Sequence, residues 1–166
     1  MTPLNSLRID SPLGGITLAA SEQGVCGVWF DEQRHGPSLA QIQSWTTAPQ
    51  NPLLVQTAEQ LQAYFAGRPY HFDLPLDLSS GTPFQQSVWQ ALLKIGGGQH
   101  QSYGDLARQL NNPKAVRAVG AAVGRNPISI IVPCHRILGA GGQLTGYAGG
   151  LWRKQALLQL EGHTST

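Results

Sequence analysis

A cysteine and a histidine stand side by side in this chain, as Cys134 and His135, with Arg136 directly after them. The thiolate is the nucleophilic form of cysteine, and neighbouring cations favour it over the thiol. A neutral His135 can take the thiol proton if a carboxylate orients its ring. Glu161 is the only glutamate in the second half of the chain. These residues fit a nucleophilic Cys–His–Glu system, and a structural cysteine remains the alternative on this chemistry alone.

The geometry of this pair depends on the segment before it. Residues 128–132 are an apolar run that follows Asn126 and Pro127, which predicts a buried extended strand. Neighbouring side chains of an extended chain point to opposite sides, so direct contact between Cys134 and His135 is unfavourable. We therefore expect a water molecule to bridge the thiol and the imidazole.

The other cysteine, Cys26, lies in an apolar segment and is expected to be a packed thiol of the core. Two cysteines make no disulfide framework, and the tight four-ligand spacing of structural zinc sites is absent. No apolar run approaches the roughly 20 residues that span a bilayer, and no secretory leader is visible. We expect a cytoplasmic protein with no metal, no cofactor and no membrane partner.

Charge is divided unevenly along the chain. Residues 1–83 carry three Lys or Arg against seven Asp or Glu, whereas residues 84–166 carry eight against two. A basic half favours a polyanionic partner such as a nucleic acid. Chance clustering on a solvated surface gives the same counts, so the asymmetry alone does not decide between them.

The first half predicts a small α/β unit. Residues 1–30 alternate between apolar and polar side chains around glycine turns, which indicates an antiparallel β-meander. Residues 31–50 are polar and read as irregular. Asn51 and Pro52 then form an N-cap signal for a helix with apolar positions up to Phe65.

Two further features complete this half. Gly67 and Pro69 end the predicted helix, and residues 71–78 alternate strictly enough to predict a strand that joins the meander. Residues 79–83 are a short polar break. We therefore divide the chain into domains at 1–80 and 81–166.

Beyond that break the pattern becomes helical. A first helix is expected from Phe84 to Ile95, and Ser102 with Asp105 forms a capping box for a helix over 102–110. Asn112-Pro113 predicts the start of another helix, to about residue 124. Two short helices at a tight joint fit a helix-turn-helix.

The second helix of that pair is thin and basic. Its small residues allow either close helix packing or entry into the minor groove of DNA, which is only about 6 Å wide. Glycines at 139–142 predict a hairpin or wing, residues 145–150 a flexible loop, and residues 151–160 a last amphipathic helix.

The string Ile131-Val132-Pro133-Cys134-His135-Arg136-Ile137 resembles the active-site signature of the O6-alkylguanine-DNA alkyltransferases, also called methylated-DNA–protein-cysteine methyltransferases. Further motifs match this family in the same order: Gly81-Thr82-Pro83-Phe84-Gln85, Val88-Trp89, Ser102-Tyr103-Gly104, Asn112 to Gly120, Asn126-Pro127, Gly146 to Gly150 and Glu161-Gly162. The resemblance covers residues 81–162 in detail and the N-terminal half in outline.

The resemblance implies an α+β fold. A small antiparallel-sheet α/β domain of the ribonuclease H-like type precedes a mainly helical, winged helix-turn-helix domain. It also implies direct-reversal DNA repair, in which the protein takes an alkyl group from O6 of guanine, or more weakly O4 of thymine, onto its own cysteine. The step is irreversible and occurs once per molecule. The expected partner is double-stranded DNA carrying O6-alkylguanine, bound by a monomer, with cooperativity on DNA left open.

The resemblance also assigns catalytic roles. Cys134 is the acceptor, His135 deprotonates it through a water, and Glu161 holds the imidazole. Asn126 fixes the turn before the active site and bonds near the thiolate. Tyr103 helps to rotate the target nucleotide out of the duplex and offers its hydroxyl to the departing guanine.

The remaining roles concern DNA. Arg117 enters the base stack and fills the space left by the flipped base. Other residues expected at the DNA are Tyr103, Gly104, Asn112, Lys114 and Ala118. The base pocket is expected to comprise Val132, Pro133, Tyr147, Ala148 and Gly149. Some family members carry a hydroxyl residue in place of Ala148, so only backbone donors are expected there.

Two rival functions have distinct signatures. A non-enzymatic winged-helix DNA-binding module explains the charge division and the helix pair but gives Cys134, His135 and Glu161 no purpose. A Cys–His hydrolase that uses water as the final acceptor turns over repeatedly, whereas a suicide acceptor stops at one equivalent.

Overall fold

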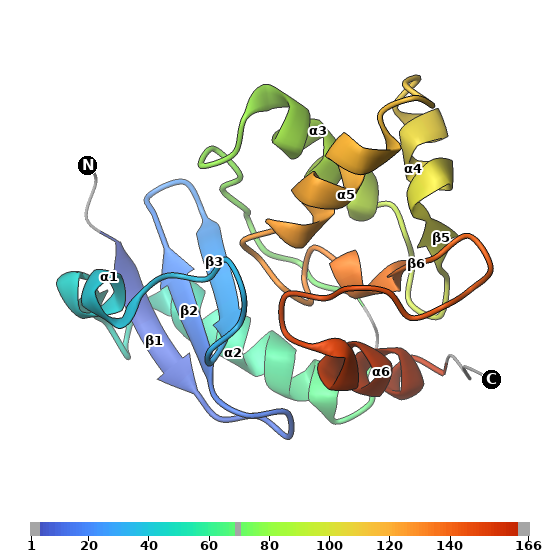
Figure 1. The fold of residues 1–166 in the computed structure, drawn as a ribbon. Helices are drawn as coiled ribbons and strands as arrows, with labels where there is room; N and C mark the ends of the chain where they lie inside the picture. The colour runs from blue at the N-terminus through green and yellow to red at the C-terminus, as the bar shows by residue number, and fades with distance from the viewer. Residues whose placement is uncertain (1–3, 69–70, 163–166) are drawn as a thin grey trace.

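The computed structural model describes residues 4–68 and 71–162, and its N-terminal half is built on a four-stranded sheet. The strands are β1 (Asn5–Ile9), β2 (Ile16–Ala20), β3 (Val25–Phe30) and β4 (Thr46–Thr47), in the order β3-β2-β1-β4. The first three are antiparallel neighbours, which confirms the predicted meander, and β4 runs parallel to β1. Helix α2 (Pro52–Phe65) packs against this sheet (Figure 1).

The segment expected to be irregular, residues 31–50, contains two short elements. Helix α1 (Leu39–Ser44) begins at a capping box in which Ser38 and Gln41 bond to each other's backbone, and β4 follows it. The Ser-x-x-Gln pattern of this capping box is visible in the sequence. Helix α1 buries none of its residues, however, so the sequence has no apolar periodicity from which the helix could be predicted. The prediction of helix α2 from Asn51 is confirmed, since the Asn51 side chain accepts from the first turn. Pro69, given as part of its stop signal, lies outside the described residues.

The predicted strand over 71–78 is wrong. The segment alternates in burial as expected, but it makes only one isolated parallel bridge, between Leu76 and Val25. The Val25 N–H donates to the Pro75 carbonyl at 2.9 Å, and the Asp77 N–H donates to the Val25 carbonyl at 2.8 Å. Pro75 has no N–H with which to extend a ladder.

A second segment covers the same strand edge. The Val28 N–H donates to the Pro127 carbonyl at 2.9 Å, and the Ser129 N–H donates to the Val28 carbonyl at 3.0 Å. Strand β3 therefore holds the turn that leads to Cys134 against the sheet of the other half.

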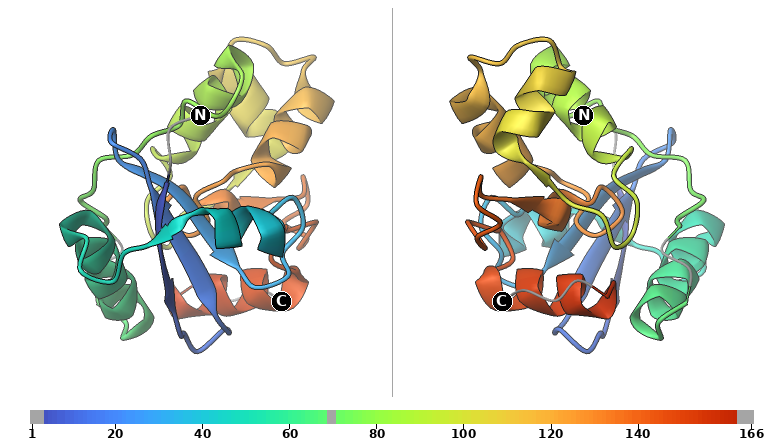
Figure 2. Two further views of the ribbon diagram at one scale, coloured as in Figure 1. Left: turned by 90° about the vertical axis from the view of Figure 1, so that its left-hand side faces the viewer. Right: turned by 90° about the vertical axis from the view of Figure 1, so that its right-hand side faces the viewer.

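The C-terminal half is mainly helical (Figures 1 and 2). Helix α3 (Pro83–Leu92) and helix α4 (Tyr103–Gln109) both start at capping boxes, and the one at Ser102 is as predicted. Helix α5 (Val116–Gly124) contacts α3 and α4, and the indole of Trp89 donates to its Ala122 carbonyl at 2.9 Å.

The predicted start of that last helix, with Asn112 as its N-cap, is wrong by three residues. The Ala115 N–H donates to the Asn112 carbonyl at 3.0 Å, which closes a separate turn, and the helix begins only at Val116. Its N-cap, Ala115, has no side-chain cap. Asn112 therefore starts a turn here, a role that asparagine followed by proline serves as well as helix capping.

The predicted strand over 128–132 is also wrong. These residues are buried, but they form a tight turn in which the Val132 N–H donates to the Ile128 carbonyl at 3.0 Å and Ile130 has a φ of 72°. A short 3₁₀ turn, η1 (Cys134–Arg136), follows directly. A continuous apolar run indicates burial and leaves the backbone conformation undetermined.

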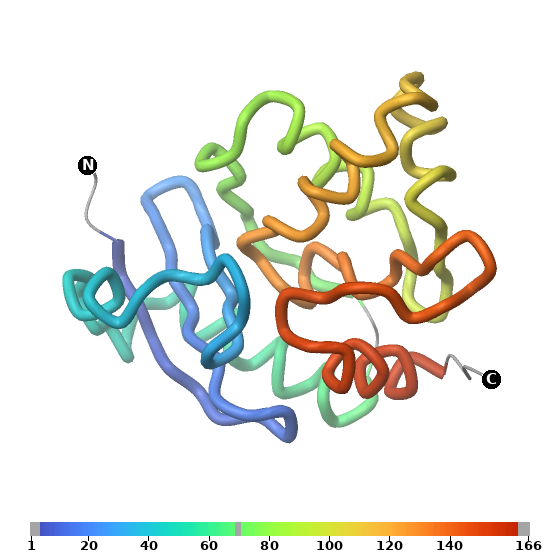
Figure 3. The backbone as a smooth tube through the Cα atoms, viewed as in Figure 1, coloured from blue at the N-terminus to red at the C-terminus, as the bar shows by residue number. Residues whose placement is uncertain are grey.

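The expected hairpin at 139–142 takes another form. Strand β6 (Ile137–Leu138) pairs in parallel with β5 (Gln101–Ser102), while Gly139 bonds to Gln143 to close a tight turn. Figure 3 follows the chain from this turn through the 145–150 loop into α6 (Leu151–Leu160), the last predicted helix.

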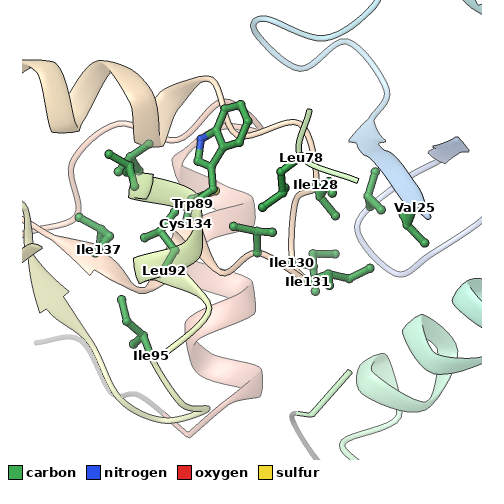
Figure 4. Close-up of a cluster of buried hydrophobic side chains, with 14 of the residues drawn as sticks. Val25, Leu78, Trp89, Leu92, Ile95, Ile128, Ile130, Ile131, Cys134 and Ile137 are labelled. Atoms are coloured by element: carbon green, nitrogen blue, oxygen red, sulfur yellow. The ribbon is translucent and has the colours of Figure 1, made fainter. Parts of the chain in front are cut away.

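One hydrophobic core includes residues of both halves. Val25 of β3 and Leu78 lie near Ile128, and Cys134 lies among the same buried side chains (Figure 4). The molecule is thus an α+β protein with a small sheet first and a helical part after it. Among the described residues, no helix has the length and apolarity needed to cross a membrane.

Candidate active site

Asn126 builds the turn that presents the cysteine. Its buried side-chain amide donates to the Val132 carbonyl at 2.7 Å and to the Ile128 carbonyl at 3.3 Å, and its oxygen accepts from the Ile128 N–H at 3.0 Å. These bonds satisfy backbone groups that a strand would pair with a neighbour. One asparagine therefore fixes both ends of the 128–132 turn.

Cys134 is buried, with 6% of its surface exposed. Burial raises the pKa of its thiol, while Asn126, Lys154 and Tyr147 each act to lower it. Burial is the largest of these effects, so the thiol is the resting form and a base is needed to make the thiolate. Cys26 is half-buried in β3, less packed than we expected, and burial together with nearby Asp77 raises the pKa of its thiol to about 11.

His135 supplies a neutral imidazole beside this thiol. Burial lowers the pKa of its ring, and Nε2 lies 2.8 Å from the Glu161 carboxylate. A carboxylate only accepts, so Nε2 carries the proton and Nδ1 is the basic nitrogen. Nδ1 is buried and has no hydrogen-bond partner among the described residues. Because Cys134 and His135 lie in a 3₁₀ turn, our argument for a bridging water from an extended chain no longer applies, although His135 is oriented as expected.

Glu161 is the centre of a buried polar network. Arg136 donates from Nε to Oε1 at 2.8 Å and from Nη2 to Oε2 at 2.9 Å, and the hydroxyl of Tyr64 donates to Oε2 at 2.5 Å. Burial by itself raises the pKa of this carboxyl, but the bonds from His135 and Arg136 outweigh it and lower the pKa to about 2. Glu161 is therefore ionised under all ordinary conditions.

Three buried polar side chains of the site, Arg136, Tyr64 and Lys154, were absent from our sequence-based site. Arg136 was seen only as a cation near the cysteine, and Tyr64 lies 97 residues before its partner Glu161. Lys154 is fully buried and donates from Nζ to the Thr145 carbonyl at 2.7 Å. Its burial lowers its pKa to about 8, whereas the nearby Cys134 acts to raise it. A lysine on the inward face of α6 was the available signal.

A cavity of about 300 Å³ reaches Cys134 from the surface. Its walls are formed by Tyr103, by residues 146–148 of the loop before α6, and by one side of α5 with its C-cap: Gly120, Ala121, Val123, Gly124 and Arg125. Arg34 and His35 of the N-terminal half also line it, and the Arg34 N–H donates to the Ala148 carbonyl at 2.8 Å. This volume lies at the small end of pockets that bind organic ligands.

The expected pocket residues divide into two groups. Tyr147 and Ala148 line this cavity. Val132 is fully buried behind it, Gly149 is buried with its carbonyl bonded to Arg153, and Pro133 lines a separate cavity of about 200 Å³.

Of the residues expected at DNA, Tyr103 lines the cavity and the others lie on α5, in the turn before it or in α4. Arg117 and Ala118 are exposed on α5, and Asn112 and Lys114 are exposed in the turn before it. Tyr103 is half-buried, faces Gly120 and accepts from the Thr145 hydroxyl at 3.3 Å, while Gly104 lies next to it in the first turn of α4. Three or more His, Cys, Asp or Glu side chains that could hold a metal do not come together anywhere in the described ranges.

Comparison with known proteins gives consistent matches. Residues 8–78 match the family model of the 6-O-methylguanine DNA methyltransferase ribonuclease-like domain, and residues 83–163 match the DNA-binding domain of the same proteins. The methylated-DNA–protein-cysteine methyltransferase of Mycobacterium tuberculosis is 51% identical over 92% of this chain and 89% of its own. That of Methanosarcina acetivorans is 47% identical over 92% and 95%. The crystal structure of Mycobacterium tuberculosis OGT in complex with DNA has a TM-score of 0.85 and 48% identity over 95% of this chain and 92% of that one.

Proposed function

This chain belongs to the methylated-DNA–protein-cysteine methyltransferase family, and we propose that Cys134 is the residue that receives the alkyl group. The protein repairs alkylated DNA by direct reversal. The observation that supports Cys134 most strongly is its place at the cavity, next to a histidine held by a buried carboxylate. Cys26 is far less suited, since it lies on strand β3 and is not among the residues that line this cavity.

The proposed step moves one proton and one alkyl group. His135 takes the proton of Cys134 at Nδ1 through a water, and Glu161 stabilises the resulting imidazolium. The thiolate sulfur forms a bond to the alkyl carbon as the bond from that carbon to O6 of guanine breaks. The electron pair stays on the guanine, which accepts a hydrogen bond from the Tyr103 hydroxyl, and the proton held by His135 passes through solvent to the guanine. A thioether is a poor leaving group, so the protein is consumed.

DNA is the partner, and double-stranded DNA carrying O6-alkylguanine is the proposed substrate, with O4-alkylthymine a weaker one. Helix α5 enters the minor groove, the target nucleotide turns out into the cavity, and Arg117 fills the gap. Flipping costs a few kcal/mol, less for a mispaired damaged base. Small residues along the exposed side of α5, such as Ala118 and Ala121, let it approach closely.

We further propose that the protein acts as a monomer in the cytoplasm, where Cys134 stays reduced, with residues 1–80 and 81–166 as its two domains. Cooperative binding along DNA is compatible with this proposal and awaits a binding isotherm. The rival hydrolase predicts repeated turnover, and the rival binding module predicts no covalent product.

Intact mass after mixing with excess duplex containing O6-methylguanine tests the function. We expect the mass of one added methyl group per chain and no more, with peptide mapping that places it on Cys134. The Cys26→Ala variant is the matched control and retains full transfer. A methyl on Cys26, or product in excess of protein, contradicts the proposal.

Methylation is also expected to weaken the fold. The added carbon replaces the thiol hydrogen of a buried side chain, and extra volume at a packed position typically costs about 1–3 kcal/mol. For a chain of this size the melting temperature then falls by about 3–10 °C, and DNA is released more readily because α5 ends two residues before Asn126. Side-by-side thermal unfolding of the free and methylated proteins measures the effect. An equal or higher melting temperature after methylation contradicts it.

A further inference from the structure

One contact joins the N-terminal half directly to the Glu161 network. Tyr64 lies near the end of α2, is 1% exposed, and donates its hydroxyl proton to Oε2 of Glu161 at 2.5 Å. The aromatic ring packs against Phe65 and Phe72, with centroids 5.5 and 5.6 Å away. The hydroxyl is therefore fixed by its own packing, independently of the carboxylate.

The Tyr64 hydroxyl bonds to the same carboxylate oxygen of Glu161 that accepts from His135. Oε2 of Glu161 accepts from His135, Arg136 and Tyr64, whereas Oε1 accepts from Arg136. Arg136 already donates to both carboxylate oxygens, and its positive charge balances the negative charge of Glu161. The hydroxyl of Tyr64 adds no charge, but it draws electron density from the one oxygen that faces the imidazole.

We propose that Tyr64 is a positioning residue for alkyl transfer. Its hydroxyl donates to Oε2 of Glu161 and thereby weakens the electrostatic attraction between this carboxylate and a protonated His135. The inference rests on the proposed role of His135 as the base. A carboxylate with one donor fewer attracts an imidazolium more strongly, and an imidazole that is already protonated at rest accepts no proton from Cys134.

The sign of the effect depends on every charged or titratable group around the ring. The groups that act on the ring directly are Lys154 of α6, Glu161 at the C-cap of α6 and Arg136 of the same turn. Tyr64 of α2 and Tyr147 of the pocket loop act through Glu161, and Cys134 is the neighbour of His135 in the chain. Arg136 and Lys154 oppose protonation of His135 and Glu161 favours it. Loss of the Tyr64 hydroxyl strengthens only the effect of Glu161, so the pKa of His135 rises.

The test is the Tyr64→Phe variant of the full chain, with single-turnover methyl transfer measured from pH 6 to 9. We expect the acid limb of the profile, followed below pH 6 as far as the protein stays folded, to move upward by about one pH unit, so that transfer is slowed by up to about tenfold at the acid end and by less than about twofold at pH 9. NMR titration of the His135 ring is expected to show the same upward shift. Affinity for DNA stays unchanged.

Thr57→Val is the matched control, because it removes a buried hydroxyl from the same helix that bonds only to the Leu53 carbonyl. Its pH profile should follow the wild type. A Tyr64→Phe profile that is unchanged, or lowered equally at every pH, overturns the inference. If the phenylalanine variant does not fold, difluorotyrosine at position 64 donates more strongly and must move the His135 titration downward.

A further variant separates this inference from the proposed mechanism. If His135→Gln transfers methyl at the wild-type rate, the base assignment itself is wrong. If His135→Gln is slow but Tyr64→Phe behaves as the wild type, only the role of Tyr64 is wrong.

Discussion

Replacing Glu161 by glutamine is expected to slow methyl transfer by about 10²–10⁴-fold, the range typical for loss of general-base catalysis. The carboxylate holds His135 through Nε2 and balances the positive charge that the ring gains from Cys134. A glutamine keeps the shape but supplies no charge, and its amide nitrogen replaces one of the two acceptors that Arg136 needs. Rapid-quench single-turnover assays on a methylated duplex measure the change.

The same substitution is expected to weaken the fold, because breaking a buried ion pair typically costs about 3–5 kcal/mol. The assay therefore includes the melting temperature of each variant and is run well below it. Glu59→Gln removes the same charge from an exposed position on α2 and should leave both stability and rate unchanged. A folded Glu161→Gln variant that transfers methyl within about threefold of the wild-type rate contradicts the role of the carboxylate in base catalysis.

The pH dependence of stability has a definite sign. The pKa of Glu161 is lowered from an ordinary 4.5 to about 2 in the folded protein. A carboxyl of this kind contributes stability that is fully present above its unfolded pKa and is lost as the pH falls toward its folded pKa. The contribution of Glu161 therefore disappears between about pH 4.5 and pH 2, and it is absent from the glutamine variant at every pH.

Replacing Arg117 by alanine is expected to reduce repair of duplex DNA by about 10- to 100-fold, while transfer from free O6-methylguanine base is unchanged. Only the duplex requires a nucleotide to be turned out of the stack, at a cost of a few kcal/mol that a stack-filling side chain offsets. Arg117 is exposed on α5 and does not line the cavity, so its loss should leave the chemistry at Cys134 intact.

The comparison needs a control for the general loss of positive charge. Arg68→Ala removes an exposed arginine from the N-terminal half and is expected to change both reactions by less than about twofold, since distant surface charge is largely screened. An equal loss on duplex and free base in Arg117→Ala means that Arg117 acts in the pocket or in the fold.

The sequence predicted the elements whose signals are local. The capping box at Ser102 and the N-cap at Asn51 act within one turn of a helix, and both are confirmed. Asn112 is followed by proline, as Asn51 is, and so has the same N-cap signal. The Ala115 N–H, however, donates to the Asn112 carbonyl and closes a separate turn before the helix begins. The apolar run at 128–132 correctly indicated burial, but the turn it adopts depends on the side chain of Asn126 bonding across it.

The site shows the same division. Cys134 and His135 are adjacent in sequence, and the pairing of His135 with Glu161 was suggested because Glu161 is the only glutamate in the second half of the chain, before the family resemblance implied it too. The contact between Tyr64 and Glu161 joins residues 97 positions apart through the packing of two halves, and no local pattern encodes it. The burial of Lys154 is even harder to predict from the sequence, because a lysine is almost never fully buried and this one donates to backbone carbonyls.

The covered edge of β3 has a consequence for the spent protein. Segments at 75–77 and 127–129 occupy backbone groups of Val25 and Val28, and the opposite edge of the sheet is β4, only two residues long. Exposed strand edges are the usual templates on which partly loosened chains aggregate. The alkylated form is expected to be less stable, and a sheet with one edge occupied and the other edge strand only two residues long offers a second copy little to pair with. The segments that hold the cysteine turn in place thus also leave a loosened molecule little free strand edge on which to aggregate.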